Sequence, residues 1–325
     1  MIEVNRLNKS FKVAKRSAGV KASFKSLFHR EYTTIHAIRD ISFTIEPGEI
    51  VGYIGPNGAG KSTTIKVMSG ILVPDSGTCR IMGHTPWKDR KQHVKNIGVV
   101  FGQRSQLWWD VPVIDSYELL KDIYKIPSSE YKANLHMLTD ILQLDDFIHA
   151  PVRQLSLGQR MRCEIAASLL HSPRLLFLDE PTIGLDAISK IAVRQFIKRI
   201  NKEKQVTVIL TTHDMIDIEA LAHRLLLIGK GNLLYDGNLN DLRGKYAHDK
   251  IITLEYAENH KPIHLEGITV MSQNTNRAVI SVNTEKMFVS DAISYLSHRY
   301  ELVDVSIETQ PVEDIIVKLY KEYAI

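Results

Sequence analysis

The sequence predicts an α/β domain built on a mostly parallel sheet, followed by a small α+β domain. Three observations support this fold class. Apolar, β-rich runs at 175–178, 206–210 and 224–228 alternate with helical stretches, which is typical of a parallel sheet covered on both faces. A glycine-rich loop joins a short buried strand to a helix. Near residue 241 the sequence pattern changes from apolar runs separated by helices to segments that alternate between apolar and polar residues. We therefore expect one domain over 1–240 and a second over 241–325.

The first domain opens with residues 1–13, which predict a strand that enters a basic turn. Residues 38–45 alternate between apolar and polar side chains and predict a second strand. Residues 49–54 predict a short buried strand, and residues 62–69 predict the helix that follows the glycine-rich loop. The interval 110–150 carries helical patterns and no further strand candidate.

The second domain is expected to contain strands at 251–256, 269–272 and 278–282. A helix at about 285–300, a strand at 302–307 and a last amphipathic helix to about 323 follow. Pro311 at the start of that helix suits the first helical turn. No cluster of catalytic residue types occurs here, so we expect this domain of about 80 residues to regulate or to dimerise.

Composition excludes several classes of protein. The 325 residues include 41 basic and 37 acidic side chains, and a net charge of +4 is too small to indicate a nucleic-acid partner. The two cysteines lack metal-ligand spacing and do not suggest a disulfide framework. No apolar run approaches the roughly 18 residues that span a bilayer, and the first residues lack the layout of a signal peptide. We expect a cytoplasmic protein that reaches a membrane only through a partner.

A basic stretch at 12–36 has two interpretations that the sequence leaves open. It carries six basic residues against one acid, and three apolar residues recur at helical spacing. The basic residues are Lys12, Lys15, Arg16, Lys21, Lys25 and Arg30, the acid is Glu31, and the apolar residues are Phe24, Leu27 and Phe28. The stretch is either a solvated basic loop or a segment whose apolar residues contact the partner or membrane while its lysines meet anionic headgroups.

The glycine-rich loop matches G-x-x-x-x-G-K-[ST] between a strand and a helix, which predicts a phosphate-binding loop. Its residues are Gly55, Pro56, Asn57, Gly58, Ala59, Gly60, Lys61, Ser62 and Thr63. Glycines let consecutive backbone N–H groups turn inward, and the helix N-terminus adds its dipole to this anion cradle. Lys61 can reach the β- and γ-phosphates, and the Ser62 hydroxyl can bind Mg²⁺.

Two carboxylates end the apolar run at 175–178. Asp179 and Glu180 emerge at the C-terminal end of that predicted strand, where open α/β sheets bind ligands. We expect Asp179 to hold Mg²⁺ directly or through water. Glu180 is the candidate general base that polarises the attacking water.

The motif that narrows the class is Leu155-Ser156-Leu157-Gly158-Gln159. With the phosphate loop, Gln103, the run at 175–181, Gly184-Leu185-Asp186 and His213, it resembles the nucleotide-binding domains of ABC transporters in the same order along the chain. The resemblance covers about residues 1–240. It implies a P-loop ATPase fold with an N-terminal antiparallel β subdomain and a helical subdomain at about 104–165. The third signature position is usually glycine in that family and is Leu157 here.

The resemblance also implies an ATP site shared by two subunits that pack head to tail. Each ATP, with Mg²⁺, would lie between one phosphate loop and the opposite signature. The implied contacts on the signature side are Ser156, Gly158 and Gln159, with Asp186 reaching the opposing phosphate loop. His213 would hold the γ-phosphate and the attacking water.

Two further roles follow from the same resemblance. Gln103 would bind Mg²⁺ and sense the membrane partner. An aromatic ring near the first strands would stack on adenine, with Phe11 the first candidate and Tyr32 the second. Leu107, Trp108 and Trp109 are expected to line a groove for a helix of the membrane subunit, unless both indole rings fill the core of the helical subdomain instead.

These motifs predict the ATP-hydrolysing subunit of an ABC transporter, resembling the ABC-2 exporters of drugs or sodium. Its partners would be a second copy or a related ATPase and an integral membrane permease, on the cytoplasmic face of the cell membrane. An ATPase that exports lipid-linked polysaccharides is the alternative, because a similar basic insertion occurs there. ABC ATPases of translation usually carry two nucleotide domains per chain, whereas this sequence has one phosphate loop. Those of chromosomes insert a long coiled coil between phosphate loop and signature, whereas here Lys61 and Ser156 lie 95 residues apart with no sustained heptads. A binder that does not hydrolyse ATP conflicts with the intact set of Lys61, Asp179, Glu180 and His213.

Overall fold

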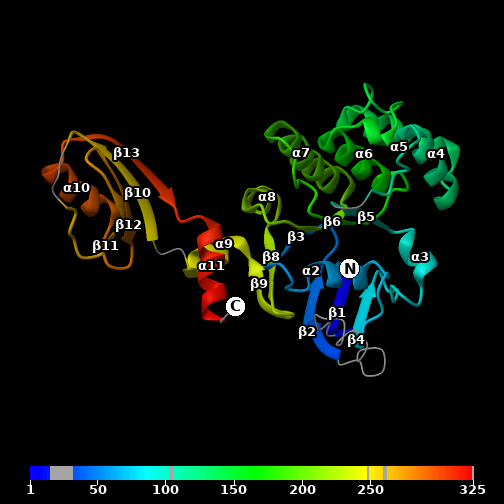
Figure 1. Ribbon diagram of the computed structural model, residues 1–325, viewed down its shortest axis with the longest axis horizontal. Helices are drawn as coiled ribbons and strands as arrows, with labels where there is room; N and C mark the ends of the chain where they lie inside the picture. Colours follow the sequence, from blue (N-terminus) through cyan, green and yellow to red (C-terminus); the bar gives the residue numbers. More distant parts are fainter. Residues whose placement is uncertain (15–31, 103–104, 247–248, 259–261, 324–325) are drawn as a thin grey trace, which may run out of the picture. The chain divides into compact units, whose positions relative to one another are not determined.

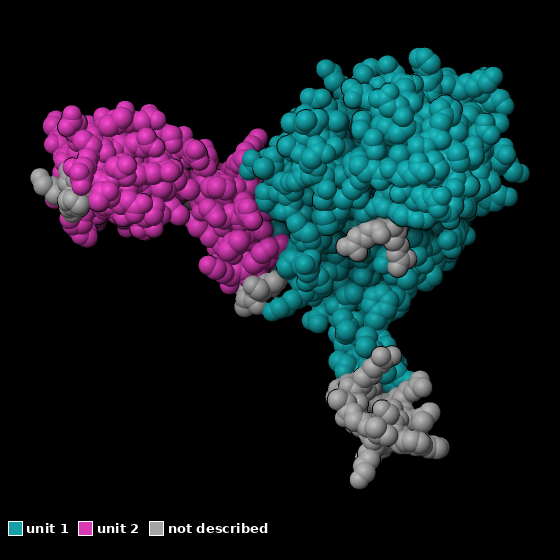
Figure 2. Space-filling view, turned by 45° about the horizontal axis from the view of Figure 1, so that its top comes forward, with its two compact units in different colours: residues 1–237 teal, residues 238–325 magenta. Residues whose placement is uncertain are grey.

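The computed structural model describes residues 1–14, 32–102, 105–246, 249–258 and 262–323. The chain forms two compact units, residues 1–237 and 238–325, which Figure 2 colours separately. Each unit is described by itself below. Among the described residues, no helix is both long and apolar enough to cross a lipid bilayer.

A six-stranded sheet with the order β5-β6-β7-β3-β8-β9 forms the centre of the first unit (Figure 1). Its strands are β3 (Ile50–Ile54), β5 (Ile97–Phe101), β6 (Leu175–Asp179), β7 (Thr207–Thr211), β8 (Arg224–Gly229) and β9 (Asn232–Asn238). The pairs β5–β6, β6–β7, β7–β3 and β3–β8 are parallel. The apolar runs within β3, β6 and β7 are continuous and do not alternate with polar residues, because helices and the antiparallel sheet of this unit, described below, cover both faces.

Some helices of the first unit lie beside this sheet, and others form a separate helical group. The described residues of the first unit form the helices α2 (Lys61–Met68), α3 (Arg90–Val94), α4 (Val113–Tyr124), α5 (Ser128–Leu142), α6 (Leu157–Leu169), α7 (Ala187–Lys204) and α8 (Met215–Leu221), with a 3₁₀ turn at Val152–Gln154. In Figure 1, α4, α5 and α6 lie at the opposite end of the unit from β1, β2 and β4. This arrangement confirms the helical subdomain.

An antiparallel sheet with the order β2-β1-β4 packs over α2. Its strands are β1 (Ile2–Ala14), β2 (Tyr32–Ile45) and β4 (Ser76–Ile81). Ile2, Ile41 and Ile45 share one core with Ile65 of α2 and Phe177 of β6. The predicted N-terminal antiparallel subdomain is therefore confirmed. The interval 12–36 begins and ends in strand, because β1 runs to Ala14 and β2 starts at Tyr32; its residues 15–31 lie outside the described part of the chain.

The second unit is a four-stranded antiparallel sheet with helices. The strand order is β11-β12-β10-β13. Its elements are α9 (Leu239–Tyr246), β10 (Asp249–Tyr256), β11 (Ile268–Gln273), β12 (Arg277–Asn283), α10 (Val289–Arg299), β13 (Leu302–Thr309) and α11 (Val312–Glu322). Ile252, Leu254 and Ile280 from the sheet pack with Ala292 and Leu296 of α10 in a core of its own. This confirms the predicted α+β character of the second domain.

Candidate functional site

The candidate site lies where β6, β7 and β3 end. These three strands are parallel neighbours, so the loops that follow them leave the same edge of the sheet. The loop after β3 is the phosphate loop, the loop after β6 carries Glu180, and the loop after β7 carries His213. Asp179 and Thr211 are register partners at this edge, and the Thr211 hydroxyl donates a hydrogen bond to Asp179 Oδ1. The topology thus brings together segments that are far apart in the sequence.

Lys61, the first residue of α2, is 7% exposed and lies across the phosphate loop. Its Nζ donates to the carbonyl oxygens of Gly55, at 2.6 Å, and Pro56, at 3.2 Å. Burial lowers the pKa of the Lys61 amine, and the nearby charges of Glu180 and Asp179 oppose that shift. A buried cation beside the first turn of a helix is suited to bind an anion.

Two glycines let the phosphate loop pack closely against its neighbours. A Cβ atom at Gly60, whose φ is +111°, would lie 2.2 Å from the Ala37 carbonyl oxygen of β2. A Cβ atom at Gly55 would lie 2.5 Å from the Ile228 carbonyl oxygen of β8. The glycines of this motif therefore serve close backbone approach as well as the conformation of the loop.

Glu180 and His213 form a pair on adjacent loops. His213 Nε2 lies 3.1 Å from Glu180 Oε1, and the Glu180 amide donates to the Thr211 carbonyl oxygen at 2.9 Å. Glu180 has a φ of +57°, an uncommon conformation that turns the chain sharply after β6. Burial raises the pKa of the Glu180 carboxyl, while the charges of His213 and Lys61 act against that rise. A carboxylate that is partly withdrawn from water and has a raised pKa suits a general base.

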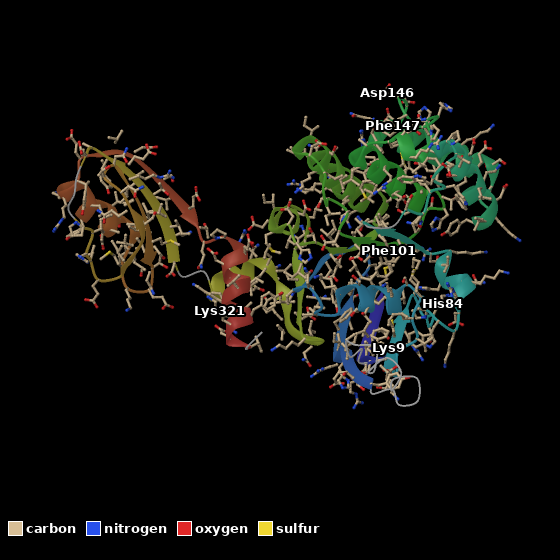
Figure 3. All side chains as sticks on the ribbon, in the orientation of Figure 1. Lys9, His84, Phe101, Asp146, Phe147 and Lys321 are labelled. Atoms are coloured by element: carbon tan, nitrogen blue, oxygen red, sulfur yellow. The ribbon has the colours of Figure 1, made fainter. Side chains whose placement is uncertain are left out.

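A cavity of about 470 Å³ opens at this edge. Its lining joins the phosphate loop, Asp179, Glu180 and His213 with Phe101 of β5, which is labelled in Figure 3. Two residues of β2, Ile35 and Ala37, also line the cavity. Phe11 and Tyr32, the two expected adenine-stacking residues, are not among the described residues that line it. Phe11 of β1 is the register partner of Ile35 of β2, so the ring expected to stack on adenine belongs to the strand next to the one that lines the cavity.

The signature residues lie outside this cavity, at the N-terminus of α6. Ser156 caps the helix: the Gln159 amide donates to Ser156 Oγ at 3.2 Å, and the Ser156 amide donates to Gln159 Oε1 at 2.9 Å. Asp186 caps α7 by accepting hydrogen bonds from the Ser189 amide and hydroxyl at 2.9 and 2.7 Å. The hydrogen bond from the Ser189 backbone amide, followed by the one from its hydroxyl, lowers the pKa of the exposed Asp186 carboxyl.

The two helix tips pack on each other. A Cβ atom at Gly158 would lie 2.6 Å from Ser189 Oγ, and a Cβ atom at Gly184 would lie 2.7 Å from Leu157 Cδ2. Leu157, which stands where the family usually has glycine, therefore fills space beside the glycine of the Gly184-Leu185-Asp186 turn. The departure from the family pattern is accommodated within the chain itself.

Gln103 lies outside the described residues, and the segment that follows it is anchored on α6. The Gln106 amide donates to both oxygens of Glu164, at 3.1 and 3.0 Å, and the Ser105 hydroxyl donates to Oε1. Burial raises the pKa of this Glu164 carboxyl, against the effect of those hydrogen bonds. Sequence reasoning missed Glu164 because its partners are distant in the chain; an acidic residue inside the otherwise apolar run 163–167 was the available signal.

The two tryptophans of this segment are exposed. Trp108 and Trp109 are 42% and 51% exposed, so the alternative interpretation, that both rings fill the helical core, is wrong. The Arg160 guanidinium carbon lies 5.8 Å from the Trp109 ring centre. Leu107 is buried, so it supports the segment rather than lining a surface groove, contrary to the expectation.

Comparison with known proteins identifies the family. The family model for ABC transporters matches residues 38–183. The ABC transporter ATP-binding protein NatA of Bacillus subtilis is 32% identical over 229 residues, which cover 70% of this chain and 92% of NatA. The chain belongs to the ABC transporter ATP-binding proteins. Among other relatives of this ABC ATPase, the linearmycin resistance ATP-binding protein LnrL of B. subtilis is 29% identical over 87% of this chain and 93% of its own.

Two further comparisons place the fold and the extent of the chain. A solved dimer of the ATP-binding cassette MJ0796 in a post-hydrolysis state, bound to ADP and Pi, superposes with a TM-score of 0.62. It is 25% identical, covering 74% of this chain and 99% of that one. Against ABC transporter A family member 1 of Dictyostelium discoideum, with 32% identity over 70% of this chain, the ABC ATPase spans only 26% of the relative's length. The fold is that of the ABC ATPases, whose domains bind ATP.

The residues present fit a nucleotide with Mg²⁺. The part of the chain that the structure describes holds no group of three or more His, Cys, Asp or Glu side chains that could bind a metal ion. Mg²⁺ in nucleotide sites usually binds through one or two carboxylates together with substrate phosphates. Asp179 and Ser62 both line the cavity beside the phosphate loop, which is consistent with such a site.

Proposed function

We propose that this chain binds and hydrolyses ATP as a head-to-tail dimer and thereby drives a separate membrane permease of the ABC-2 exporter type. The observation that carries the proposal is that the expected ATP-binding residues lie in two separate places on the chain. The phosphate loop, Asp179, Glu180 and His213 line one cavity, whereas Ser156 and Gly158 lie outside it at the tip of α6. Ser156 is exposed, so the signature is available to a nucleotide held by a second copy.

In this proposal the polar residues of the cavity divide the steps of the reaction among them. The Lys61 amine and the amides of the phosphate loop hold the β- and γ-phosphates. Glu180 accepts a proton from water, whose oxygen bonds to the γ-phosphorus as the bond to the ADP oxygen breaks. His213, at 3.1 Å from Glu180, orients that carboxylate and the water. Mg²⁺ held by Asp179 and Ser62 would supply charge neutralisation at the phosphate oxygens.

The second copy completes the site through the N-terminus of α6. The first-turn N–H groups of a helix have no intrahelical partners and favour an anion there. The γ-phosphate would bridge one phosphate loop and the opposite signature, so its release after hydrolysis removes the anion that joins the two copies. The dimeric MJ0796 cassette bound to ADP and Pi supports this arrangement by relationship.

The permease is proposed to dock on the exposed apolar residues of the helical subdomain. Trp108, Trp109 and Val111 precede α4, and Leu119 and Ile123 are four positions apart on it; all five are exposed. Residues four apart share a helix face. Such an apolar surface suits a helix of a membrane protein better than solvent. The relatives NatA and LnrL, the second named for antibiotic resistance, support the exporter type and a place at the cytoplasmic face of the membrane.

The decisive experiment is size-exclusion chromatography with light scattering on the Glu180→Gln variant. Without the base, ATP still joins the two copies but is not consumed, so a stable dimer should form with ATP and Mg²⁺ and be absent without ATP. Adding Ser156→Glu as a control places a negative charge against the γ-phosphate and should return the protein to monomer while ATP binding to the phosphate loop persists. A protein that stays monomeric with ATP would overturn the shared-site proposal.

A further inference from the structure

The carboxylate of Asp217 in α8 contacts both loops of the candidate catalytic pair. Its side chain has no exposed surface. Thr182 Oγ1 donates a hydrogen bond to Asp217 Oδ2, and Thr212 Oγ1 lies 3.5 Å from the same oxygen, at the outer limit of a hydrogen bond. Thr182 follows Glu180 by two positions, and Thr212 immediately precedes His213. One buried side chain thus joins the loop after β6 to the loop after β7.

The Thr212 hydroxyl extends this connection into the start of α8. It accepts a hydrogen bond from the Asp214 amide at 3.0 Å, and Asp214 in turn caps α8 by accepting from the Ile216 amide at 3.0 Å. The backbone on both sides of His213 is therefore held by groups that meet at Asp217. Because His213 lies 3.1 Å from Glu180, small shifts of either loop change that distance directly.

Basic side chains of α7 connect to the same network. Arg194 Nε lies 3.0 Å from Asp217 Oδ1 as an ion pair that lacks the alignment of a hydrogen bond. Lys190 Nζ lies 2.6 Å from Asp214 Oδ2. α7 is the helix that Asp186 caps, so the network runs from the turn at Asp186 to the catalytic pair.

Stability alone is a weak reason for such an arrangement. A buried ion pair loses its hydration, and apolar side chains of similar volume often replace one without loss of stability. Position, in contrast, matters strongly for a reaction, because a displacement of about 1 Å can lower a rate about a hundredfold. Each partner of Asp217 either lies within two positions of a candidate catalytic residue or lies on α7, and this pattern of contacts favours a role in position.

We propose that Asp217 is a positioning residue for ATP hydrolysis, which holds Glu180 and His213 in register through Thr182 and Thr212 and ties them to α7 through Arg194. This inference rests on the proposed function. It predicts that loss of the network slows the chemical step and leaves ATP binding to the phosphate loop unchanged, because Lys61 and its neighbours take no part in it.

The test is the steady-state ATPase activity of the full-length Thr182→Val variant, which keeps the shape of the side chain and removes its hydroxyl. We expect kcat to fall about tenfold or more, with KM for ATP within about twofold of the wild type; tenfold corresponds to about 1.4 kcal/mol in the barrier. Thr182→Ser restores the hydroxyl and should recover most of kcat. Thr207→Val is the matched control: it removes a buried threonine hydroxyl that binds the Gly48 amide at the opposite end of β7, and it should keep kcat.

Each outcome decides between the two proposals. If the wild type does not hydrolyse ATP, the proposed function fails. If the wild type is active and Thr182→Val keeps its kcat, or Thr182→Ser loses as much as Thr182→Val, the positioning role of Asp217 is refuted. Should Thr182→Val not fold, Thr212→Val carries the same expectation. Unfolding of both variants beside a folded Thr207→Val would assign the network to folding and overturn the inference.

Discussion

Alanine substitutions at two glycines of the phosphate loop should have unequal effects, because only one of the two positions touches another strand. Gly58 and Gly60 both have positive φ, +79° and +111°. A Cβ atom at Gly58 would meet nothing within 4 Å, whereas one at Gly60 would lie 2.2 Å from the Ala37 carbonyl oxygen. Gly60→Ala therefore forces β2 and the phosphate loop apart by about 1.3 Å if a normal contact is to be restored, since non-bonded heavy atoms pack at roughly 3.5 Å.

The magnitude follows from two contributions. An L-residue at positive φ costs about 1–2 kcal/mol, which both variants share. Overpacking adds about 1–3 kcal/mol, which only Gly60→Ala incurs. The difference in the free energy of unfolding between the variants should therefore be about 1–3 kcal/mol. At about 2–4 °C for each kcal/mol in a unit of this size, the Tm of Gly60→Ala should lie several degrees below that of Gly58→Ala.

The assay is thermal unfolding of the full-length variants without nucleotide, read on the transition of the first unit, with urea unfolding as a second measure. Binding of a fluorescent ATP analogue should also weaken at least tenfold in Gly60→Ala, because the displaced loop no longer aims its amides at one point. If Gly60→Ala is as stable as Gly58→Ala, the contact with Ala37 does not constrain the loop and the reasoning is wrong.

Two further predictions concern the base and the membrane partner. In the proposed function Glu180 acts as a base in its ionised form. Because burial raises its pKa, kcat should fall as the pH falls, with a midpoint above the ordinary glutamate value of about 4.3; a pH–rate profile with its acid midpoint at or below that value contradicts the role of burial. Joint replacement of Trp108 and Trp109 by alanine should abolish co-purification with the permease while basal ATPase activity and Tm change little, because both rings are exposed. Phe288→Ala, an exposed apolar change in the second unit, is the control that should retain the permease.

The parts of the site that depend on local sequence were predictable. The strand, glycine loop and helix around Lys61 follow one another directly, and the apolar run before Asp179 predicts a buried strand without any knowledge of its neighbours. The structure shows the strand Ile50–Ile54 and the helix Lys61–Met68 close to the expected bounds. Parallel order at the sheet edge then brings Glu180 and His213 together.

The parts that depend on distant contacts were not predictable. Ile35 lines the cavity because β2 starts at Tyr32, but the polar residues Thr33, Thr34 and His36 masked the strand pattern within a basic stretch. Asp217 looks like an ordinary polar residue of a short helix, and only the fold places it against Thr182. Side-chain burial is a property of the assembled chain, so a single sequence gives little sign of it.

The contact between the tips of α6 and α7 affects how two copies of the chain would recognise each other. Leu157 occupies the space beside Gly184, and Ser189 occupies the space beside Gly158, so the two tips pack closely against each other. In the proposed dimer, a second copy would therefore meet a preshaped surface, and association would require little loss of loop freedom. The pairing of the copies would then be governed chiefly by the negative charge of the nucleotide between them, which makes nucleotide hydrolysis an effective trigger for their separation.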